Sequence, residues 1–408
     1  MISKMTNSVK NGESLTRETK IKILAIIREN DSISRLEVAR KSGYSTATVT
    51  RIVDSLINEE DLVEEKGNKS LPRGRPRKAL YFKGHNKYII GIDLGTTYIR
   101  GVLSDYNTES IKEIDVITEA YKGHKHVLSK VVEVVENLQN TTLVDPSQIR
   151  GVGLAVAGMI NTSTDTVEYS PAFDWHEIEL RKILAGKIKR PLFYDNVSRL
   201  MALGELQFGE GRKYDNFITV NVGYGIGAGI IINKKLFYGT DGMAGELGHQ
   251  PVCGDNMIKC SCGKTTCLTA YSSGDAIAKR AVIKLKEGVE SILTELSDNR
   301  YDAITAKMVA IASQKGDKLA TEIFNNGVDY LGLSIAGIIN MFNPQAVFIG
   351  GGVSLNGTIF WDRLKSVIDD NVLRISTKST IQPVTYHGKS AIYGALSLVL
   401  REALNFNI

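Results

Sequence analysis

The chain has few of the residues that crosslink or interrupt a fold. Its 408 residues include only four cysteines, eight prolines and two tryptophans. Although 43% of the residues are hydrophobic, no apolar run approaches the roughly 18 residues needed to span a bilayer. The N-terminal segment also lacks the apolar core of a signal peptide, so we expect a cytoplasmic protein. In that compartment, clustered thiols indicate a metal site rather than disulfides.

All four cysteines fall within fifteen positions, shortly after the segment Gly245-Glu246-Leu247-Gly248-His249. Three thiolates and one imidazole at short loop spacings predict a closed tetrahedral zinc site. The candidate ligands are His249, Cys260, Cys262 and Cys267. Cys253 is then a spare thiol, or a substitute ligand if His249 points elsewhere. Two interpretations stay open: the zinc only staples the loop 245–270, or it also positions Glu246 and His249 for a ligand.

Positive charge is concentrated in the first fifth of the chain. Residues 1–87 hold 18 Lys and Arg against 11 Asp and Glu, whereas the remainder holds 32 against 34. Such asymmetry indicates a domain that contacts a polyanion. The length of the chain also favours two or three domains over one.

Helical signals begin within this basic segment. Apolar residues at helical spacing predict a first helix over 15–28. Ser34 and Glu37, three residues apart, form a capping box for a second helix over 35–41. That helix is expected to end at Gly43.

A third helix is predicted over 46–57, with Ser45 as its cap. Its apolar residues all face one side: Val49, Ile52, Val53 and Leu56. The other side, with the cap, supplies the candidate DNA contacts Ser45, Thr46, Ala47, Thr48, Thr50 and Arg51. Short side chains let the backbone approach base edges, while Arg51 can reach a guanine or a phosphate. A tight glycine turn between two such helices predicts a helix-turn-helix; the alternative is a helical bundle with an incidental surface.

Two predicted strands, over 61–65 and 78–82, flank a loop rich in Gly, Pro, Lys and Arg and indicate a wing. Its tip offers three further candidate DNA contacts: Arg73, Arg75 and Arg77. An Arg-Gly-Arg-Pro segment fits the narrow minor groove of AT-rich DNA, where negative potential is concentrated. The alternative is a solvated linker.

From Tyr88 onward, short apolar runs alternate with longer helical segments, which is typical of an α/β protein. Glycine-bearing loops follow predicted strands at 89–97, 220–229 and 346–354. The first places Asp93 and a Gly-Thr turn at a strand end, where they can hold a nucleotide phosphate and its metal. Each loop alone is a weak signal, because glycine also serves turns and close packing. The order of the three, with the Glu/His/Cys cluster between the second and third, is specific.

Together these motifs resemble the ROK family (repressors, open reading frames, kinases), in particular its winged-helix regulators such as xylose and N-acetylglucosamine repressors. The resemblance extends from about Thr16 to the end of the chain. It implies a winged helix-turn-helix with a basic wing and linker over 1–86. Over 87–408 it implies the sugar-kinase fold, an actin-like ATPase or ribonuclease-H-like body of two α/β lobes around a sugar cleft. The family pattern also matches the zinc ligands, and its members use the residues matching Glu246 and His249 to contact sugar hydroxyls.

The sugar kinases of this family carry Glu-Asn-Asp before a helix that ends in Gly-Glu, and the Asp is a general base. Counting back eight residues from Glu205, the base position holds Val197, which cannot accept a proton. Asp195 would replace it only if the following helix gained two residues. Asn196 matches the family Asn and is expected to contact the sugar.

Other departures point the same way. Tyr224 stands where kinases have a small Thr, and its ring would crowd a phosphate held by backbone amides. Thr269 and Ala172 replace a sugar-binding Glu and an Asn, so ligand preference is expected to differ. Asp93 keeps the first phosphate loop, which leaves weak ATP binding open. We therefore expect structural zinc, no catalytic residues, and no requirement for ATP.

The sequence as a whole predicts a sugar-responsive repressor of carbohydrate-use genes, with a monosaccharide or sugar phosphate as effector. A homodimer or homotetramer would place paired winged helices on palindromic double-stranded DNA. One alternative is an active ATP-dependent sugar kinase with an appended DNA-binding domain. Another is a zinc-stapled scaffold that binds no small ligand.

Overall fold

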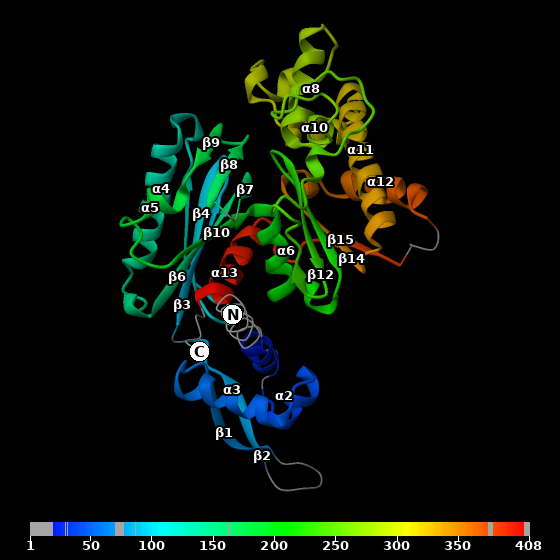
Figure 1. The fold of residues 1–408 in the computed structure, drawn as a ribbon. Helices are drawn as coiled ribbons and strands as arrows, with labels where there is room; N and C mark the ends of the chain where they lie inside the picture. The colour runs from blue at the N-terminus through cyan, green and yellow to red at the C-terminus, as the bar shows by residue number, and fades with distance from the viewer. Residues whose placement is uncertain are drawn as a thin grey trace, which may run out of the picture.

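In the computed structural model a small N-terminal domain lies below two α/β lobes (Figure 1). The structure describes residues 19–28, 30, 32–69, 77–85, 87–161, 164–373 and 378–403. Among the described residues, no helix is long and apolar enough to cross a membrane.

The N-terminal domain contains a helix over 19–28, α2 (Arg35–Ser42), α3 (Thr46–Asn58), and a hairpin of β1 (Val63–Lys69) and β2 (Arg77–Phe82). The predicted capping box is confirmed. Glu37 N donates to Ser34 Oγ at 3.4 Å, and Ser34 N donates to Glu37 Oε2 at 2.8 Å. Gly43 ends α2 in the left-handed conformation, at φ 77°, so the predicted turn of the helix-turn-helix is also confirmed.

The predicted boundaries of the first wing strand were wrong. Asp61 adopts a left-handed backbone with φ 51°, and Leu62 N donates to Leu56 O, so both residues belong to the turn after α3. The strand begins at Val63 and continues to Lys69, because β2 pairs with it over that whole length. Arg73 and Arg75 lie outside the described residues, and only the backbone of Arg77 is described.

The two lobes repeat one topology. The sheet of lobe 1 has the order β10-β6-β3-β4-β5, and that of lobe 2 has the equivalent order β15-β14-β11-β12-β13. In each lobe an antiparallel hairpin is extended by two parallel strands. The strands of lobe 1 are β3 (Tyr88–Leu94), β4 (Tyr98–Asp105), β5 (Ser110–Ile117), β6 (Ile149–Val156) and β10 (Leu192–Asn196). Those of lobe 2 are β11 (Phe217–Val222), β12 (Ile226–Ile232), β13 (Lys235–Leu236), β14 (Ala346–Gly350) and β15 (Thr380–Pro383).

Further elements cover these sheets. Lobe 1 adds a small sheet of β7 (Met159–Asn161), β8 (Thr166–Ser170) and β9 (Trp175–Ile178), with α4 (His124–Gln139) and α5 (Leu180–Leu184). Lobe 2 adds α7 (Thr269–Ser272), α8 (Gly274–Lys286), α9 (Leu293–Leu296), α10 (Ala306–Gln314), α11 (Lys318–Phe342) and α12 (Thr358–Asn371). This duplicated arrangement is the actin-like sugar-kinase fold, so the predicted fold class is confirmed.

Two helices, α6 (Val197–Gln207) and α13 (Ser390–Ala403), cross between the lobes (Figure 1). A Cβ on Gly394 would lie 1.9 Å from Leu200 O, and a Cβ on Gly204 would lie 2.9 Å from Gly394 N. Because neither glycine has a side chain, the two backbones approach closely. Lobe 1 packs against α13 and lobe 2 against α6, so the crossing is where the lobes meet.

Candidate functional site

Four side chains of the loop between β13 and α7 converge on one point. Their ligand atoms all lie within 4.8 Å of one another, and they belong to His249, Cys260, Cys262 and Cys267. Cys260 Sγ lies 3.7 Å from His249 Nδ1, and Cys262 Sγ lies 3.3 Å from Cys267 Sγ. Three thiols and an imidazole form the donor set of a closed Zn²⁺ site. Cys253 is exposed and outside this cluster, so the predicted four residues are the ones brought together.

Two groups of the cluster hold protons that a cation would have to displace. Burial, the largest single effect, would raise the pKa of Cys260, but its contacts with His249 and Cys262 together lower that pKa to about 6. The contact with Cys260 raises the pKa of His249 to about 9, and burial raises the pKa of Cys267 to about 12. A divalent cation would displace these protons from His249 and Cys267, since metal binding requires deprotonated ligands.

Protein contacts also fix the loop that carries the cysteines. Pro251 forms a β-bridge with Cys267 at the base of the loop. Asp255 accepts hydrogen bonds from Arg280 at 2.5 and 2.9 Å, and that guanidinium lies 4.6 Å above the Tyr271 ring. The β-bridge and the ion pair with α8 therefore fix the loop in addition to the cluster.

A cavity of about 630 Å³ opens between the lobes beside this cluster. Its volume is within the range of small-molecule sites in proteins. Two glycine hairpins, β3–β4 and β11–β12, and the cysteine loop over 245–270 contribute to its lining. The lining includes Asp93, Ala172, Asn196, Tyr224, Glu246, His249 and Thr269. The structure thus gathers in one cavity residues that are up to 298 positions apart in the sequence, from Asp93 to Ala391.

Glu246 and His249 link the cluster to the cavity. The His249 ring directs Nδ1 toward Cys260 and Nε2 toward Glu246, whose Oε2 lies 4.0 Å away. Desolvation raises the pKa of Glu246, although the charge of His249 opposes the shift. A metal on Nδ1 would fix the ring beside the carboxylate. This geometry is compatible with the second interpretation, in which the metal site also positions a ligand-binding pair, and that interpretation stays a prediction.

Asn196 lines the cavity but already has structural partners. Its Oδ1 caps α6 by accepting from Ser198 N at 2.8 Å and Arg199 N at 3.4 Å. Its Nδ2 donates to Gly158 O at 2.7 Å. Beside the sugar contact predicted for it, Asn196 therefore holds the start of α6 against lobe 1, a role that no sequence motif indicates.

Asp195 is directed away from the cavity. It is 3% exposed and accepts a hydrogen bond from Arg199 Nε at 2.7 Å, while Tyr238 donates to its other oxygen at 3.2 Å. A carboxylate committed to a buried ion pair is poorly placed to take a proton from a ligand. Val197, which the sequence predicts at the base position of the family kinases, is the first residue of α6 and does line the cavity.

The two glycine hairpins differ in what they offer a phosphate. In the first, burial raises the pKa of Asp93 to about 6, against the opposing charge of Arg100. In the second, Gly223 N donates to Gly225 O at 2.9 Å, which places Tyr224 at the tip of the turn. Tyr224 is 49% exposed and lines the cavity.

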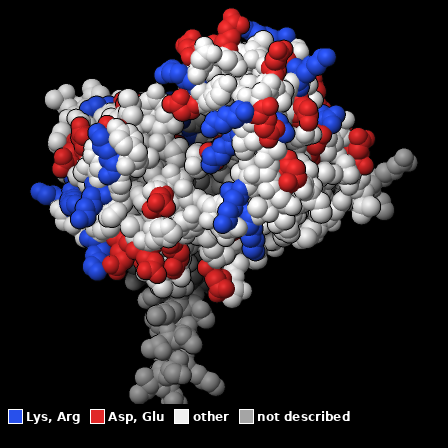
Figure 2. Space-filling view, turned by 90° about the horizontal axis from the view of Figure 1, so that it is seen from above, with Lys and Arg blue, Asp and Glu red and all other residues white. Residues whose placement is uncertain are grey.

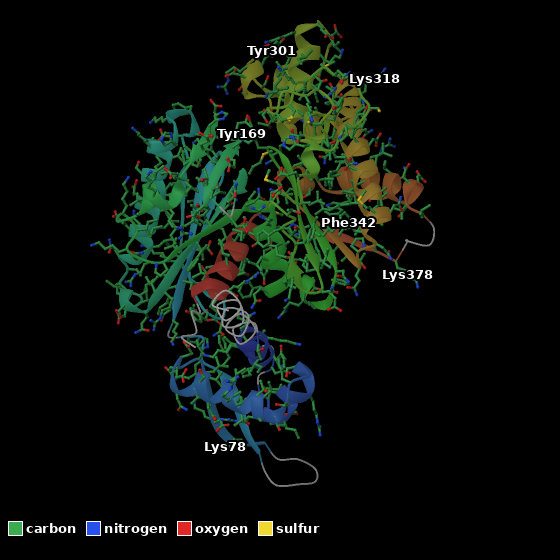
Figure 3. All side chains as sticks on the ribbon, in the orientation of Figure 1. Lys78, Tyr169, Tyr301, Lys318, Phe342 and Lys378 are labelled. Carbon is green, nitrogen blue, oxygen red and sulfur yellow. The ribbon has the colours of Figure 1, made fainter. Side chains whose placement is uncertain are left out.

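Tyr169 makes a contact across the mouth of the cleft that the sequence analysis missed. It lies on β8 of lobe 1, at the edge that faces lobe 2 (Figure 3). Its hydroxyl donates to Ser261 O of the cysteine loop at 3.5 Å. The two residues are 92 positions apart, and no local pattern could have indicated their pairing.

The predicted DNA-reading side chains lie on one face of α3. Ser45, Thr46, Ala47, Thr50 and Arg51 are exposed, and Thr48 is partly buried. The apolar residues of α3 are buried as predicted: Val49, Ile52, Val53 and Leu56. The Ser45 hydroxyl accepts from Thr48 N at 3.1 Å, so the cap also has a local role.

Arg35 ties the recognition helix to the wing, a role that the sequence analysis missed. Its Nε donates to Glu65 of β1 at 2.7 Å, and its Nη1 lies 2.7 Å from Asp54 of α3. The ion pair offsets the negative charge of Asp54 on α3, the helix that also carries Arg51. On the upper face of the lobes, by contrast, acidic and basic side chains are interspersed (Figure 2). Nucleic-acid-binding surfaces are usually basic, so the N-terminal domain is the better candidate.

Comparison with known proteins agrees with this architecture. The profile of the ROK family matches residues 89–402, and that of a winged helix-turn-helix DNA-binding domain matches residues 16–60. The chain is 31% identical over 397 residues to the xylose repressor of Caldicellulosiruptor bescii, which covers 97% of this chain and 98% of that protein.

Two solved structures share the fold. One is a ROK family transcriptional regulator, a homolog of the E. coli MLC protein, with a TM-score of 0.79 and 23% identity over 95% of this chain and 96% of that one. The other is a ROK family glucokinase from Streptomyces griseus in complex with glucose and AMPPNP. Its TM-score is 0.68, with 27% identity over 76% of this chain and 98% of that one.

The fold and the site therefore define a winged helix-turn-helix joined to a two-lobed, actin-like sugar-kinase body. The chain belongs to the ROK family, and specifically to its transcriptional regulators with an N-terminal winged helix.

The cysteine cluster predicts one zinc ion per chain. Cys262→Ser should lose that ion and lower the unfolding temperature by several degrees, because the free energy of metal binding also stabilises the folded loop. Cys253→Ser is the matched control and should keep both zinc and stability. Metal analysis and calorimetry test the pair. A full zinc content in Cys262→Ser, or none in the unaltered protein purified without chelators, would contradict the site.

The wing predicts salt-dependent DNA binding. Replacing Arg73, Arg75 and Arg77 with Ala should weaken binding to all sequences and flatten the dependence of log K on log salt by up to about 2.7, at roughly 0.9 per phosphate contact. A triple variant at the exposed Lys182, Lys187 and Lys189 of lobe 1 removes the same charge and should leave the slope unchanged. Equal slopes for the wing variant and the unaltered protein would make the tip a linker.

Proposed function

We propose that this protein is a sugar-responsive transcriptional repressor of carbohydrate-use genes. In this proposal residues 1–86 bind operator DNA and residues 87–408 bind the effector. The observation that carries it is the combination, in one chain, of an exposed polar recognition face on α3 and a sugar-sized interlobe cavity. The similarity to the xylose repressor over nearly the whole chain supports the same assignment.

We assign the effector to the half of the cavity beside the cysteine cluster. Glu246, His249 and Asn196 would contact its hydroxyls, and zinc on His249, Cys260, Cys262 and Cys267 would fix the ring of His249. A carboxylate and an imidazole suit a monosaccharide or sugar phosphate, since buried hydroxyls need paired acceptors and donors. Ala172 and Thr269 are smaller than the family residues at their positions, and they would set which sugar fits.

The DNA contacts would be made by the N-terminal domain: Ser45, Thr46, Ala47, Thr48, Thr50, Arg51, Arg73, Arg75 and Arg77. We propose a homodimer, or a tetramer built from dimers, because a twofold assembly presents two recognition helices to the two halves of a palindrome. Effector binding would close the lobes and change how the paired domains meet the operator. Coupling of about 1–3 kcal/mol would shift operator affinity roughly 5- to 150-fold.

The effector test is a titration of labelled DNA by fluorescence anisotropy. Duplexes selected from a random-sequence library by the protein itself supply the operator. We expect xylose, glucose, N-acetylglucosamine or one of the corresponding 6-phosphates to change operator affinity at least about fivefold, the lower end of typical coupling. If a sugar binds the cleft by calorimetry yet leaves operator affinity unchanged, the regulator proposal is wrong.

The second candidate function is an active sugar kinase with an appended DNA-binding domain, which the glucokinase-like fold and the retained Asp93 favour. We propose instead that the body is catalytically inactive, because Val197 occupies the base position and Asp195 is paired with Arg199. The unaltered protein should therefore show no sugar-dependent ATP turnover. Turnover above that of a Glu246→Ala control would overturn this assignment, whereas turnover gained only in Val197→Asp would support a disabled kinase.

A further inference from the structure

The first helix of the N-terminal domain is packed into the body. Ile23, Leu24 and Ile27 of the helix over 19–28 are buried in one hydrophobic core. From the body, that core includes Ile89 of β3, Val102 of β4, Phe208, and the α13 residues Ile392, Leu396, Val399 and Leu400. The DNA-binding domain is thus attached through a shared core rather than through the chain connection alone.

Arg28, in the last turn of that helix, reaches the other lobe. Its guanidinium lies 4.8 Å above the ring of Phe208, and its Nη2 donates to Gln207 O at 2.9 Å. Gln207 is the last residue of α6, and Phe208 follows it. The apolar side of the helix over 19–28 therefore shares a core with α13 and lobe 1. Arg28 on the same helix contacts the end of α6, the helix against which lobe 2 packs.

The opposite ends of α6 and α13 lie in the cavity. Val197 and Ser198 at the start of α6, and Ser390 and Ala391 at the start of α13, belong to its lining. An eleven-residue helix such as α6 is about 16 Å long at 1.5 Å per residue, so it joins the cavity to the Arg28 contact as a single rigid element. Both helices thus connect the effector site to the DNA-binding domain.

Contacts near Phe208 make the end of α6 a defined junction. Thr385, just before α13, donates to both oxygens of the buried Glu205, from its backbone N and its Oγ1, at 2.6 Å each. Tyr386 donates to Phe208 O at 3.0 Å. These bonds fix Phe208 relative to the segment that enters α13, and Arg28 covers the outer side of this junction.

We infer that the contact of Arg28 with Phe208 and Gln207 transmits lobe closure to the DNA-binding domain. A displacement of α6 at its cavity end, at Val197, would shift its other end and the Phe208 ring beneath Arg28, because a helix of eleven residues moves as one rigid element. A cation–π contact weakens once the cation is more than about 6 Å from the ring, so it is made well in only one arrangement of the lobes. The inference rests on the proposed function, because it names the residues through which that site is regulated.

The test compares Arg28→Ala with Lys22→Ala in the full-length protein. Lys22 is a matched control: its Nζ lies 5.2 Å from the Tyr44 ring and donates to Ser42 O at 2.9 Å, but both partners lie within the N-terminal domain. For each protein, the operator dissociation constant is measured by anisotropy without sugar and with a saturating member of the same sugar panel. The ratio of the two values measures the coupling.

We expect Arg28→Ala to bind operator and sugar separately within about threefold of the unaltered protein. Its coupling ratio should fall at least about threefold, as the loss of a partly buried cation–π contact implies. Lys22→Ala should keep the full ratio. Phe208→Leu retains an apolar side chain but removes the ring, and it should reproduce the effect of Arg28→Ala, which makes the result independent of one variant's folding.

The outcomes separate the two claims. If the unaltered protein couples sugar to operator and both Arg28→Ala and Phe208→Leu keep the full ratio, this inference is overturned and the proposed function stands. If the unaltered protein itself shows no coupling, the proposed function fails and the inference fails with it. An equal loss of coupling in Lys22→Ala would also overturn the inference, because the effect would then belong to the N-terminal domain as a whole.

Discussion

Two helices cross between the lobes at a point where neither carries a side chain. A methyl group on Gly394 would overlap the backbone of Leu200, so the contact depends on glycine at this position. Around this contact one buried core joins the two lobes, with Ala155 of β6, Leu200 of α6, Phe217 of β11 and Ala395 of α13. The cavity lies on one side of this crossing, and the shared core with the N-terminal domain lies on the other. We propose that changes in the cavity reach the DNA-binding domain through these two helices.

The chemistry of the cleft suits binding better than reaction. A kinase needs a base beside the acceptor hydroxyl and an open cradle for the phosphate. Here Val197 stands at the predicted base position, and the neighbouring carboxylate of Asp195 forms an ion pair with Arg199. Tyr224 lies in the turn between β11 and β12 and lines the cavity. What remains is the pair that we propose for sugar recognition, Glu246 beside a His249 ring that the cysteine cluster can hold. We therefore propose that the cleft binds a sugar without altering it.

Much of the fold could be predicted because its signals are local. Ser34, Glu37 and Gly43 mark the ends of α2 within ten residues, and the four residues of the candidate metal site lie within a single loop. The errors and omissions have a common physical origin, since they depend on conformation or on pairing between distant segments. Asp61 lies in the turn between α3 and β1 with a left-handed backbone. Arg28 contacts Phe208, which is 180 residues away in the sequence. No periodicity specifies such contacts before the chain has folded.

We propose that sugar binding in the interlobe cavity and operator binding by the N-terminal domain are linked by a free energy of coupling. Linkage requires that if the sugar changes operator affinity by some factor, the operator changes sugar affinity by the same factor. The most direct measurement is therefore calorimetric titration of the sugar into the free protein and into the protein saturated with operator duplex. We predict two sugar dissociation constants whose ratio equals the ratio found for operator binding. Identical sugar affinities in the two titrations would contradict the account, because the cavity and the winged helix would then act independently.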